Sequence, residues 1–234
     1  MRERTLGGLH VRLAGGTDRE GGGDGPLVVL LHGFGAPGDD LVPLWRVLDV
    51  PEGTRFAFPA APLELEMGYG ESRAWWMIDP SLFADLERGI RRDRTADVPP
   101  ALAEARARLC ALLDDAESQL GAKQIVLGGF SQGAMLSLDV ALHTDRPLAG
   151  LALLSGTLIA RPEWEPRLPA RRGLRVLQSH GRQDPLLPFS VAEQLRDLMV
   201  QNGLSVDFIP FHGAHQIPDK VLDRLGAFIG EVTG

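Results

Sequence analysis

Ser131 lies between Gly129 and Gly133 in the segment GGFSQGAML, directly after an apolar run and before a segment with helical spacing. This succession of strand, tight turn and helix is typical of a nucleophile elbow, in which a strained turn exposes a serine hydroxyl. The two glycines remove side chains that would collide with the strand and the helix. The alternative is an ordinary turn serine, and the flanking elements favour the nucleophile.

A serine nucleophile needs a base and an acid, and in this arrangement the acid and then the histidine follow the serine along the chain. Asp184 comes just after the apolar run LRVLQS, and His215 comes just after VDFIPF. His215 would accept the serine proton, while Asp184 would orient the imidazole and stabilise its charged form. Asp184 as a mere turn residue is one alternative. His212 competes with His215, which we favour because Gly213 permits a turn before it.

The backbone is expected to supply the groups that stabilise a developing oxyanion. One donor is the N–H of Gln132, which follows the serine at the positive end of the predicted helix. The other is expected in the segment LLHGFGAPGDD, where the N–H of Phe34 would face the site. A flexible turn is the alternative interpretation of this segment. His32 within it, and His180 in the segment SHG, are interpreted as structural hydrogen-bonding residues.

The elements that must position these residues alternate between strands and helices. Uniformly apolar runs predict strands buried on both faces, and a half-buried strand precedes them in LGGLHVRLAGG. The glycine-rich segment GGTDREGGGDGP predicts a turn or flexible loop. We predict one α/β domain over residues 1–234, with a mostly parallel doubly wound sheet and helices on both faces. The expected buried strands are 27–31, 55–59, 125–129, 151–155, 174–179 and 206–211, and the expected helices are 100–120, 190–202 and 218–232.

Residues 62–100 do not fit this alternation. They show no clear strand and carry Tyr69, Trp75, Trp76 and Met77 among acidic residues and arginines. A long irregular connection in a compact domain is often a lid or a binding loop. The bulky side chains have a second explanation, because large apolar residues commonly anchor a loop to the core.

Composition and charge exclude several classes of protein. The formal net charge of −7 over 234 residues argues against a nucleic-acid partner, which requires a basic face. The basic cluster Arg88–Arg94 is broken by Asp93 and is predicted to be a solvated face. Cys110 is the only cysteine, so no intrachain disulfide forms, and we expect it to be a buried packing residue on the apolar face of the helix 100–120. No cluster has metal-ligand spacing, and neither a metal nor another cofactor is implied.

The start of the chain, MRERTLGGLH, contains no apolar leader, and no later run is long enough to span a membrane. We therefore expect a cytoplasmic protein. A homodimer is compatible with the sequence.

The segments LHGFGAPGDD, GGFSQGAML, SHGRQDPLLP and HGAHQIP together resemble the phospholipase/carboxylesterase family of α/β hydrolases, which includes acyl-protein thioesterases and small bacterial carboxylesterases. The resemblance runs over nearly the whole chain in order and spacing. It implies the α/β-hydrolase fold and a catalytic triad of Ser131, Asp184 and His215. It also implies an oxyanion hole formed by the amides of Phe34 and Gln132.

The same resemblance places the segment SRAWWMID near the acyl pocket, so Trp75, Trp76 and Met77, with Leu186 after the acid, are candidates for the substrate wall. The implied substrate is a small-molecule carboxylic ester, an acyl-thioester or a lysophospholipid. Two alternatives remain open: a catalytically silent binding protein with this fold, and an acyltransferase that uses the same acyl-enzyme. The filled triad positions argue against the silent protein.

Overall fold

The computed structural model describes residues 1–68, 70–90 and 92–234 of the chain. These residues form a nine-stranded sheet in the order β1-β2-β5-β4-β8-β9-β10-β11, with β3 paired to β2. The pairs β1–β2 and β2–β5 are antiparallel, and all pairs from β5 to β11 are parallel. This arrangement confirms the predicted mostly parallel sheet. The strands are β1 Arg2–Leu6, β2 Leu9–Gly16, β3 Glu20–Gly22, β4 Leu27–Leu31, β5 Arg55–Pro59, β8 Ile125–Phe130, β9 Gly150–Leu154, β10 Arg175–Gly181 and β11 Ser205–Phe211.

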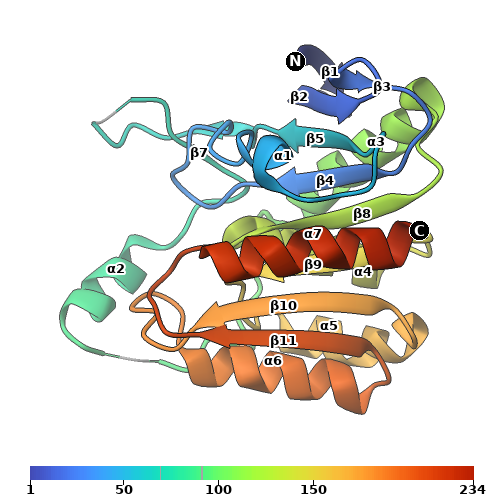
Figure 1. Cartoon of the computed structure of the whole chain (residues 1–234). Coiled ribbons are helices and arrows are strands. Elements are labelled where there is room, and N and C mark those ends of the chain that lie inside the picture. Colours follow the sequence, from blue (N-terminus) through green and yellow to red (C-terminus); the bar gives the residue numbers. More distant parts are fainter. Residues whose placement is uncertain (69, 91) are drawn as a thin grey trace.

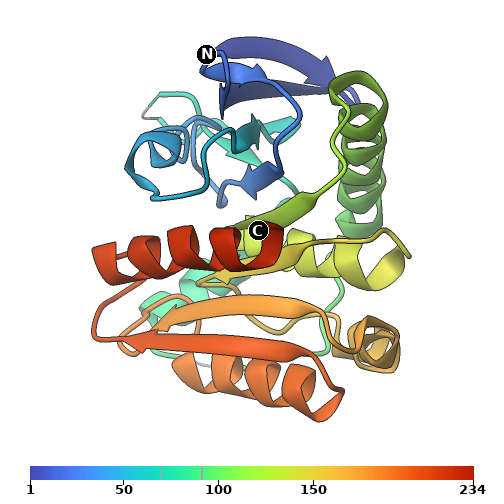
Figure 2. The same ribbon diagram turned by 45° about the vertical axis from the view of Figure 1, so that its right-hand side comes forward.

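Helices cover both faces of the sheet (Figures 1 and 2), and the central strands β4, β5, β8 and β9 are buried along nearly their whole length. The edge strand β11 is only partly buried, so the prediction of a strand buried on both faces is wrong for 206–211, because β11 has a paired neighbour on one side only. Leu27, Val29 and Leu31 of β4 pack in one apolar cluster, with side chains of α3, α4, α5 and α6. Val28 and Leu30 pack in a second cluster on the opposite face, with side chains of α7 and residues that flank α1. This division explains why β4 is apolar throughout. The helices are α1 Leu44–Val47, α3 Leu102–Leu120, α4 Gln132–His143, α5 Arg161–Trp164, α6 Phe189–Gln201 and α7 Asp219–Thr233, and the 3-10 helix η1 covers Glu165–Arg171.

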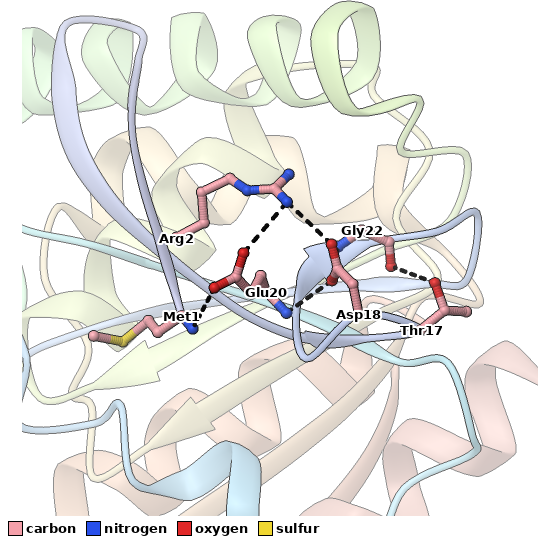
Figure 3. Close-up of polar contacts among 6 residues, drawn as sticks. All are labelled: Met1, Arg2, Thr17, Asp18, Glu20 and Gly22. Atoms are coloured by element: carbon pink, nitrogen blue, oxygen red, sulfur yellow. Dashed lines mark hydrogen bonds and ion pairs between the residues drawn. The ribbon is translucent and has the colours of Figure 1, made fainter.

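The N-terminal part corrects one prediction, because the glycine-rich segment expected to be a loop contains β3. Asp18 orders this segment: its Oδ1 accepts the N–H groups of Glu20 and Gly22, both at 2.8 Å. These hydrogen bonds hold the pKa of the Asp18 carboxyl below its ordinary value. Arg2 of β1 adds ion pairs with Asp18 and Glu20, and the terminal amine of Met1 pairs with Glu20 (Figure 3).

The connection 62–100, expected to be irregular, contains two short strands and a helix: β6 Leu63–Glu64, β7 Arg73–Ala74 and α2 Pro80–Glu87. The helix has a start signal, since Oδ1 of Asp79 accepts the N–H of Ser81 at 2.8 Å and Pro80 occupies the first helical position. Figure 1 shows α2 beyond the end of the sheet to which β10 and β11 point. Tyr69 and Arg91, which belong to this connection, lie outside the described residues.

Helix α3 carries Cys110 at the border of the core. Leu109 and Leu112 are fully buried, whereas Cys110 is only partly buried and packs against the same cluster. Burial raises the pKa of its thiol. Cys110 thus contacts the core as predicted, but it is not fully buried as predicted.

Helix α3 spans 19 residues, yet neither it nor another helix of the described ranges combines the length and apolar character needed to cross a bilayer.

Candidate active site

Ser131 stands where β8 ends and α4 begins, in the turn that the sequence predicts. Its backbone has φ 54° and ψ −115°, a conformation that non-glycine residues rarely adopt. The turn is held on both sides: the N–H of Ser131 donates to the carbonyl of Leu154 at 2.8 Å, and its own carbonyl accepts the N–H of Ala134 at 3.0 Å. The surrounding hydrogen bonds therefore maintain a strained backbone at this serine.

The glycines on either side of Ser131 allow the backbone of β4 to approach the turn. A Cβ atom added to Gly133 would lie 2.2 Å from the carbonyl oxygen of Leu31, and one added to Gly129 would lie 2.5 Å from the same oxygen. Because the colliding atom belongs to the backbone of a central strand, it cannot move aside as a flexible side chain would. The packing of the elbow on β4 therefore requires glycine at both positions.

We expect Gly133→Ala to lower the free energy of unfolding by about 1–3 kcal/mol, because the new methyl group forces apart packed backbone segments. Gly230→Ala in α7 is the matched control, since a Cβ at Gly230 meets only ordinary contacts with Pro51 at 3.7 Å. The control is expected to keep or raise stability, because alanine favours a helix more than glycine does. Urea denaturation of both variants measures the difference, and equal stabilities would contradict the close approach at Gly133.

Asp184 and His215 form a hydrogen-bonded pair at the ends of β10 and β11. Nδ1 of His215 lies 2.7 Å from Oδ2 of Asp184, while Oδ1 of Asp184 accepts the N–H groups of Leu186 and Leu187, each at 2.9 Å. An ionised carboxylate only accepts hydrogen bonds, so Nδ1 of His215 carries a proton, and in the neutral ring Nε2 then has the free lone pair. Burial opposes ionisation of Asp184, but the hydrogen bonds from His215 and from the two N–H groups hold its pKa below the ordinary value.

Two further histidines lie near this pair. His212 is exposed. The ring of His180 is buried, and its Nε2 donates to the carbonyl of Leu187 at 2.9 Å and lies 3.4 Å from Oδ2 of Asp184. Burial lowers the pKa of His180. His180 thus makes the structural hydrogen bond expected from the sequence, in the loop that holds Asp184, but no sequence signal indicated its proximity to the acid.

Ser131 and His215 line one cavity of about 660 Å³. The ring of Phe130, which precedes the serine, packs on the ring of His215 with 4.7 Å between their centroids. Gly33, Phe34 and Gln132 line the same cavity. A Cβ added to Gly33 would lie 3.3 Å from that of Ser131, so the loop after β4 lies against the elbow. The structure thus places both residues predicted to supply the oxyanion donors in the lining of the cavity that Ser131 and His215 share.

The four candidates for the substrate wall separate into two groups. Trp76, Met77 and Leu186 line the cavity; Trp76 is 4% exposed, Met77 59% and Leu186 41%. Trp75 is 2% exposed, is not among the lining residues, and donates its indole N–H to the carbonyl of His32 at 3.0 Å. Trp75 therefore has the anchoring geometry, whereas Trp76 lies where it can contact a substrate.

The rest of the cavity is mostly apolar, with a charged group on one part of its wall. There the carboxylate of Asp85 pairs with Arg92 at 2.9 Å and with Arg94 at 3.6 Å. Both arginines line the cavity, so the prediction that the cluster Arg88–Arg94 is only a solvated face is wrong for Arg92 and Arg94. In the part of the chain that the structure describes, no three His, Cys, Asp or Glu side chains are placed to hold a metal ion. The apolar side chains of the lining include Ile78, Leu82, Ile90, Val98, Met135, Leu158, Ile159 and Val191.

Comparison with known proteins agrees with this architecture. The profile of the phospholipase/carboxylesterase family matches residues 21–233. Acyl-protein thioesterase 1 of Neurospora crassa is 26% identical over 218 residues, which are 87% of this chain and 85% of that protein. The corresponding protein of Mycosarcoma maydis is 27% identical over 219 residues, with coverage of 86% and 89%.

Solved structures show the same likeness. The crystal structure of esterase PE8 superposes with a TM-score of 0.80 at 28% identity and covers 96% of this chain and 99% of that one. Acyl-protein thioesterase 2 of Zea mays has a TM-score of 0.70 at 20% identity, with coverage of 96% and 99%, and so shares the fold. The chain therefore belongs to the phospholipase/carboxylesterase family of α/β hydrolases and is an esterase-type hydrolase.

Proposed function

We propose that this protein hydrolyses carboxylic esters and thioesters through an acyl-enzyme formed on Ser131. The observation that carries the proposal is the 2.7 Å contact between Nδ1 of His215 and Oδ2 of Asp184. This contact leaves Nε2 of His215 as a base, and His215 lines the same cavity as Ser131. A buried acid, an oriented histidine and a serine on a strained turn are the parts of a serine hydrolase triad.

The proposed reaction has two halves. In the first, Oγ of Ser131 attacks the substrate carbonyl while Nε2 of His215 accepts the hydroxyl proton, and Asp184 stabilises the resulting imidazolium. The N–H groups of Phe34 and Gln132 stabilise the oxyanion of the tetrahedral intermediate. The intermediate then expels the alcohol or thiol, which takes the proton from His215. In the second half a water molecule gives a proton to Nε2 of His215 and attacks the acyl-enzyme. The bond to Oγ of Ser131 then breaks, the carboxylic acid leaves, and His215 returns the proton to Ser131.

The cavity favours a substrate with an apolar acyl group. Its wall is formed largely by aliphatic side chains and by Trp76, and burial of each methylene there contributes about 0.8 kcal/mol. The similarity to acyl-protein thioesterases adds thioesters to the substrate class, since the tetrahedral chemistry is the same for an oxygen or a sulfur leaving group. The proposed substrates are thus esters and thioesters of fatty acyl chains.

A panel of p-nitrophenyl esters and acyl-thioesters of increasing chain length tests this function. We expect turnover of both classes, with complete loss of activity after one equivalent of an alkyl fluorophosphonate has reacted. A folded protein that neither turns over the panel nor reacts with the fluorophosphonate would instead be a binding protein. Addition of an alcohol acceptor distinguishes an acyltransferase, because ester products would then exceed the free acid.

Neighbouring tryptophans are expected to differ in their effects. Trp76→Ala should change the ratio of kcat/KM between long and short acyl esters, because Trp76 lines the cavity. Trp75→Ala should leave this ratio unchanged and lower the free energy of unfolding by about 3–5 kcal/mol, because its buried side chain lies outside the lining. Thermal melting and the long-to-short activity ratio, measured for both variants, decide which tryptophan contacts the substrate and which anchors the loop. An altered ratio in Trp75→Ala with wild-type stability would show that Trp75 contacts the substrate.

A further inference from the structure

The peptide unit that carries the Phe34 N–H has a buried side chain bonded to its other end. The carbonyl of this unit belongs to Gly33, and in a planar trans peptide the C=O and N–H groups point in opposite directions. A group that fixes the carbonyl of Gly33 therefore aims the N–H of Phe34. Nδ1 of His32 lies 2.8 Å from this carbonyl oxygen, and the N–H of Ala36 adds a longer bond of 3.4 Å.

The ring of His32 is fixed in one protonation state. Its Nε2 accepts the backbone N–H of Ala61 at 2.9 Å, so the ring proton must reside on Nδ1, where it is donated to Gly33. The ring is 2% exposed, and burial lowers the pKa of His32. A neutral ring with this tautomer is a donor of fixed direction toward the peptide of the proposed oxyanion hole.

Trp75 extends this contact to the second donor. Its indole N–H donates to the carbonyl of His32 at 3.0 Å, and its ring packs beside the histidine ring at a tilt of 37°, with 5.5 Å between centroids. The backbone N–H of Trp75 donates to Oε1 of Gln132 at 2.9 Å, while Nε2 of Gln132 donates to the carbonyl of Trp76 at 2.9 Å. Both ends of the buried Gln132 amide are thus bonded to the tryptophan segment.

We propose that His32, Trp75 and the side chain of Gln132 form one hydrogen-bonded frame that positions both oxyanion donors, with His32 aiming the N–H of Phe34. The inference rests on the proposed esterase function. Donors of an oxyanion hole accelerate the reaction only when they are oriented in advance, and loss of one typically reduces kcat about 100- to 1,000-fold. His32 and Trp75 are positioning residues, because neither lines the cavity.

The first experiment compares His32→Leu with His32→Asn. Leucine fills the space without a donor, whereas the amide nitrogen of asparagine can replace Nδ1 near the carbonyl of Gly33. We expect His32→Leu to reduce kcat about 10- to 100-fold while KM stays within about twofold of the wild-type value. The loss of kcat is smaller than for a removed donor, because the N–H of Phe34 is still present but is no longer held in one direction. His32→Asn is expected to recover most of kcat. The rate of phosphonylation by an alkyl fluorophosphonate should fall in parallel, because its phosphoryl oxygen occupies the oxyanion hole.

The second experiment removes the indole donor and keeps an aromatic ring in its place. Trp75→Phe is expected to lower kcat about tenfold without a change in KM. Trp164→Phe is the matched control: the indole of Trp164 is also buried and donates to Oδ1 of Asp139 at 2.9 Å, outside the cavity lining. The control should show a similar fall in melting temperature but keep kcat within about twofold.

Equal kcat losses in Trp75→Phe and Trp164→Phe, or equal losses in His32→Leu and His32→Asn, would overturn the frame in favour of a general effect on packing. Wild-type kcat in folded Trp75→Phe and His32→Leu would overturn it as well. If His32→Leu does not fold, the comparison of Trp75→Phe with Trp164→Phe decides. All of these results leave the proposed function intact, because the wild-type protein is still active and phosphonylated. A wild-type protein that is neither active nor phosphonylated would overturn the proposed function itself.

Discussion

Ser131→Ala is expected to reduce kcat for p-nitrophenyl esters about a millionfold while the protein remains folded. The change removes the nucleophilic oxygen and nothing that the packing of the elbow requires, since the turn is held by backbone hydrogen bonds to Leu154 and Ala134. Initial rates and melting curves of the variant measure both effects. Ser118→Ala on the exposed side of α3 is the control and should retain full activity. More than a few per cent of wild-type activity in Ser131→Ala would contradict its role as nucleophile.

The second large effect is expected at the histidine–acid pair. His215→Ala should be nearly as severe as the loss of the serine, and Asp184→Asn should reduce kcat about 10,000-fold, because an amide at this position favours the wrong tautomer of His215. The 2.7 Å contact with Nδ1 is the structural basis for this expectation. His212→Ala is the matched control, since that ring is exposed three residues before His215. Initial-rate measurements on all three variants separate the roles.

A severe loss of kcat in His212→Ala together with a mild loss in His215→Ala would assign the role of the base to His212 instead of His215. Wild-type activity in Asp184→Asn would show that another carboxylate orients the base. The bonds from Leu186 and Leu187 to Oδ1 of Asp184 also remain available to an asparagine side-chain oxygen, so this variant is expected to fold.

The sheet and the order of the site along the chain could be predicted because both follow from local patterns. Strands such as β4 are apolar throughout, which indicates burial on both faces, and their boundaries agree closely with the structure. Ser131, Asp184 and His215 each come soon after such a run, and parallel strands end at one edge of a sheet. The sequence therefore predicts that the three residues lie near one another, even though the course of the loops is unknown at that stage. The sequence does not predict the strand β1, because three of its five residues are exposed and their sequence, RERTL, shows little apolar pattern.

Other features depend on contacts that no local pattern indicates. The bonds from Trp75 to His32 and from Gln132 to Trp76 join residues 43 and 56 positions apart, so they arise only from the packing of the loop after β7 on the elbow. Trp75 and Trp76 follow β7 in a bend whose course no sequence pattern gives, and hence the sequence could not decide which tryptophan faces the cavity. The helix α2 is different, because Asp79 and Pro80 form a start signal that the sequence interpretation overlooked.

Peptide mapping of the fluorophosphonate-treated protein tests the assignment of Ser131 most directly. The proposed mechanism predicts one adduct per chain, on the peptide that contains Ser131, together with complete loss of esterase activity. The adduct should be absent from Ser131→Ala and should form far more slowly in His215→Ala, where no base accepts the hydroxyl proton. An adduct on any other serine of an inactivated wild-type protein, or an equally rapid adduct in Ser131→Ala, would contradict the assignment.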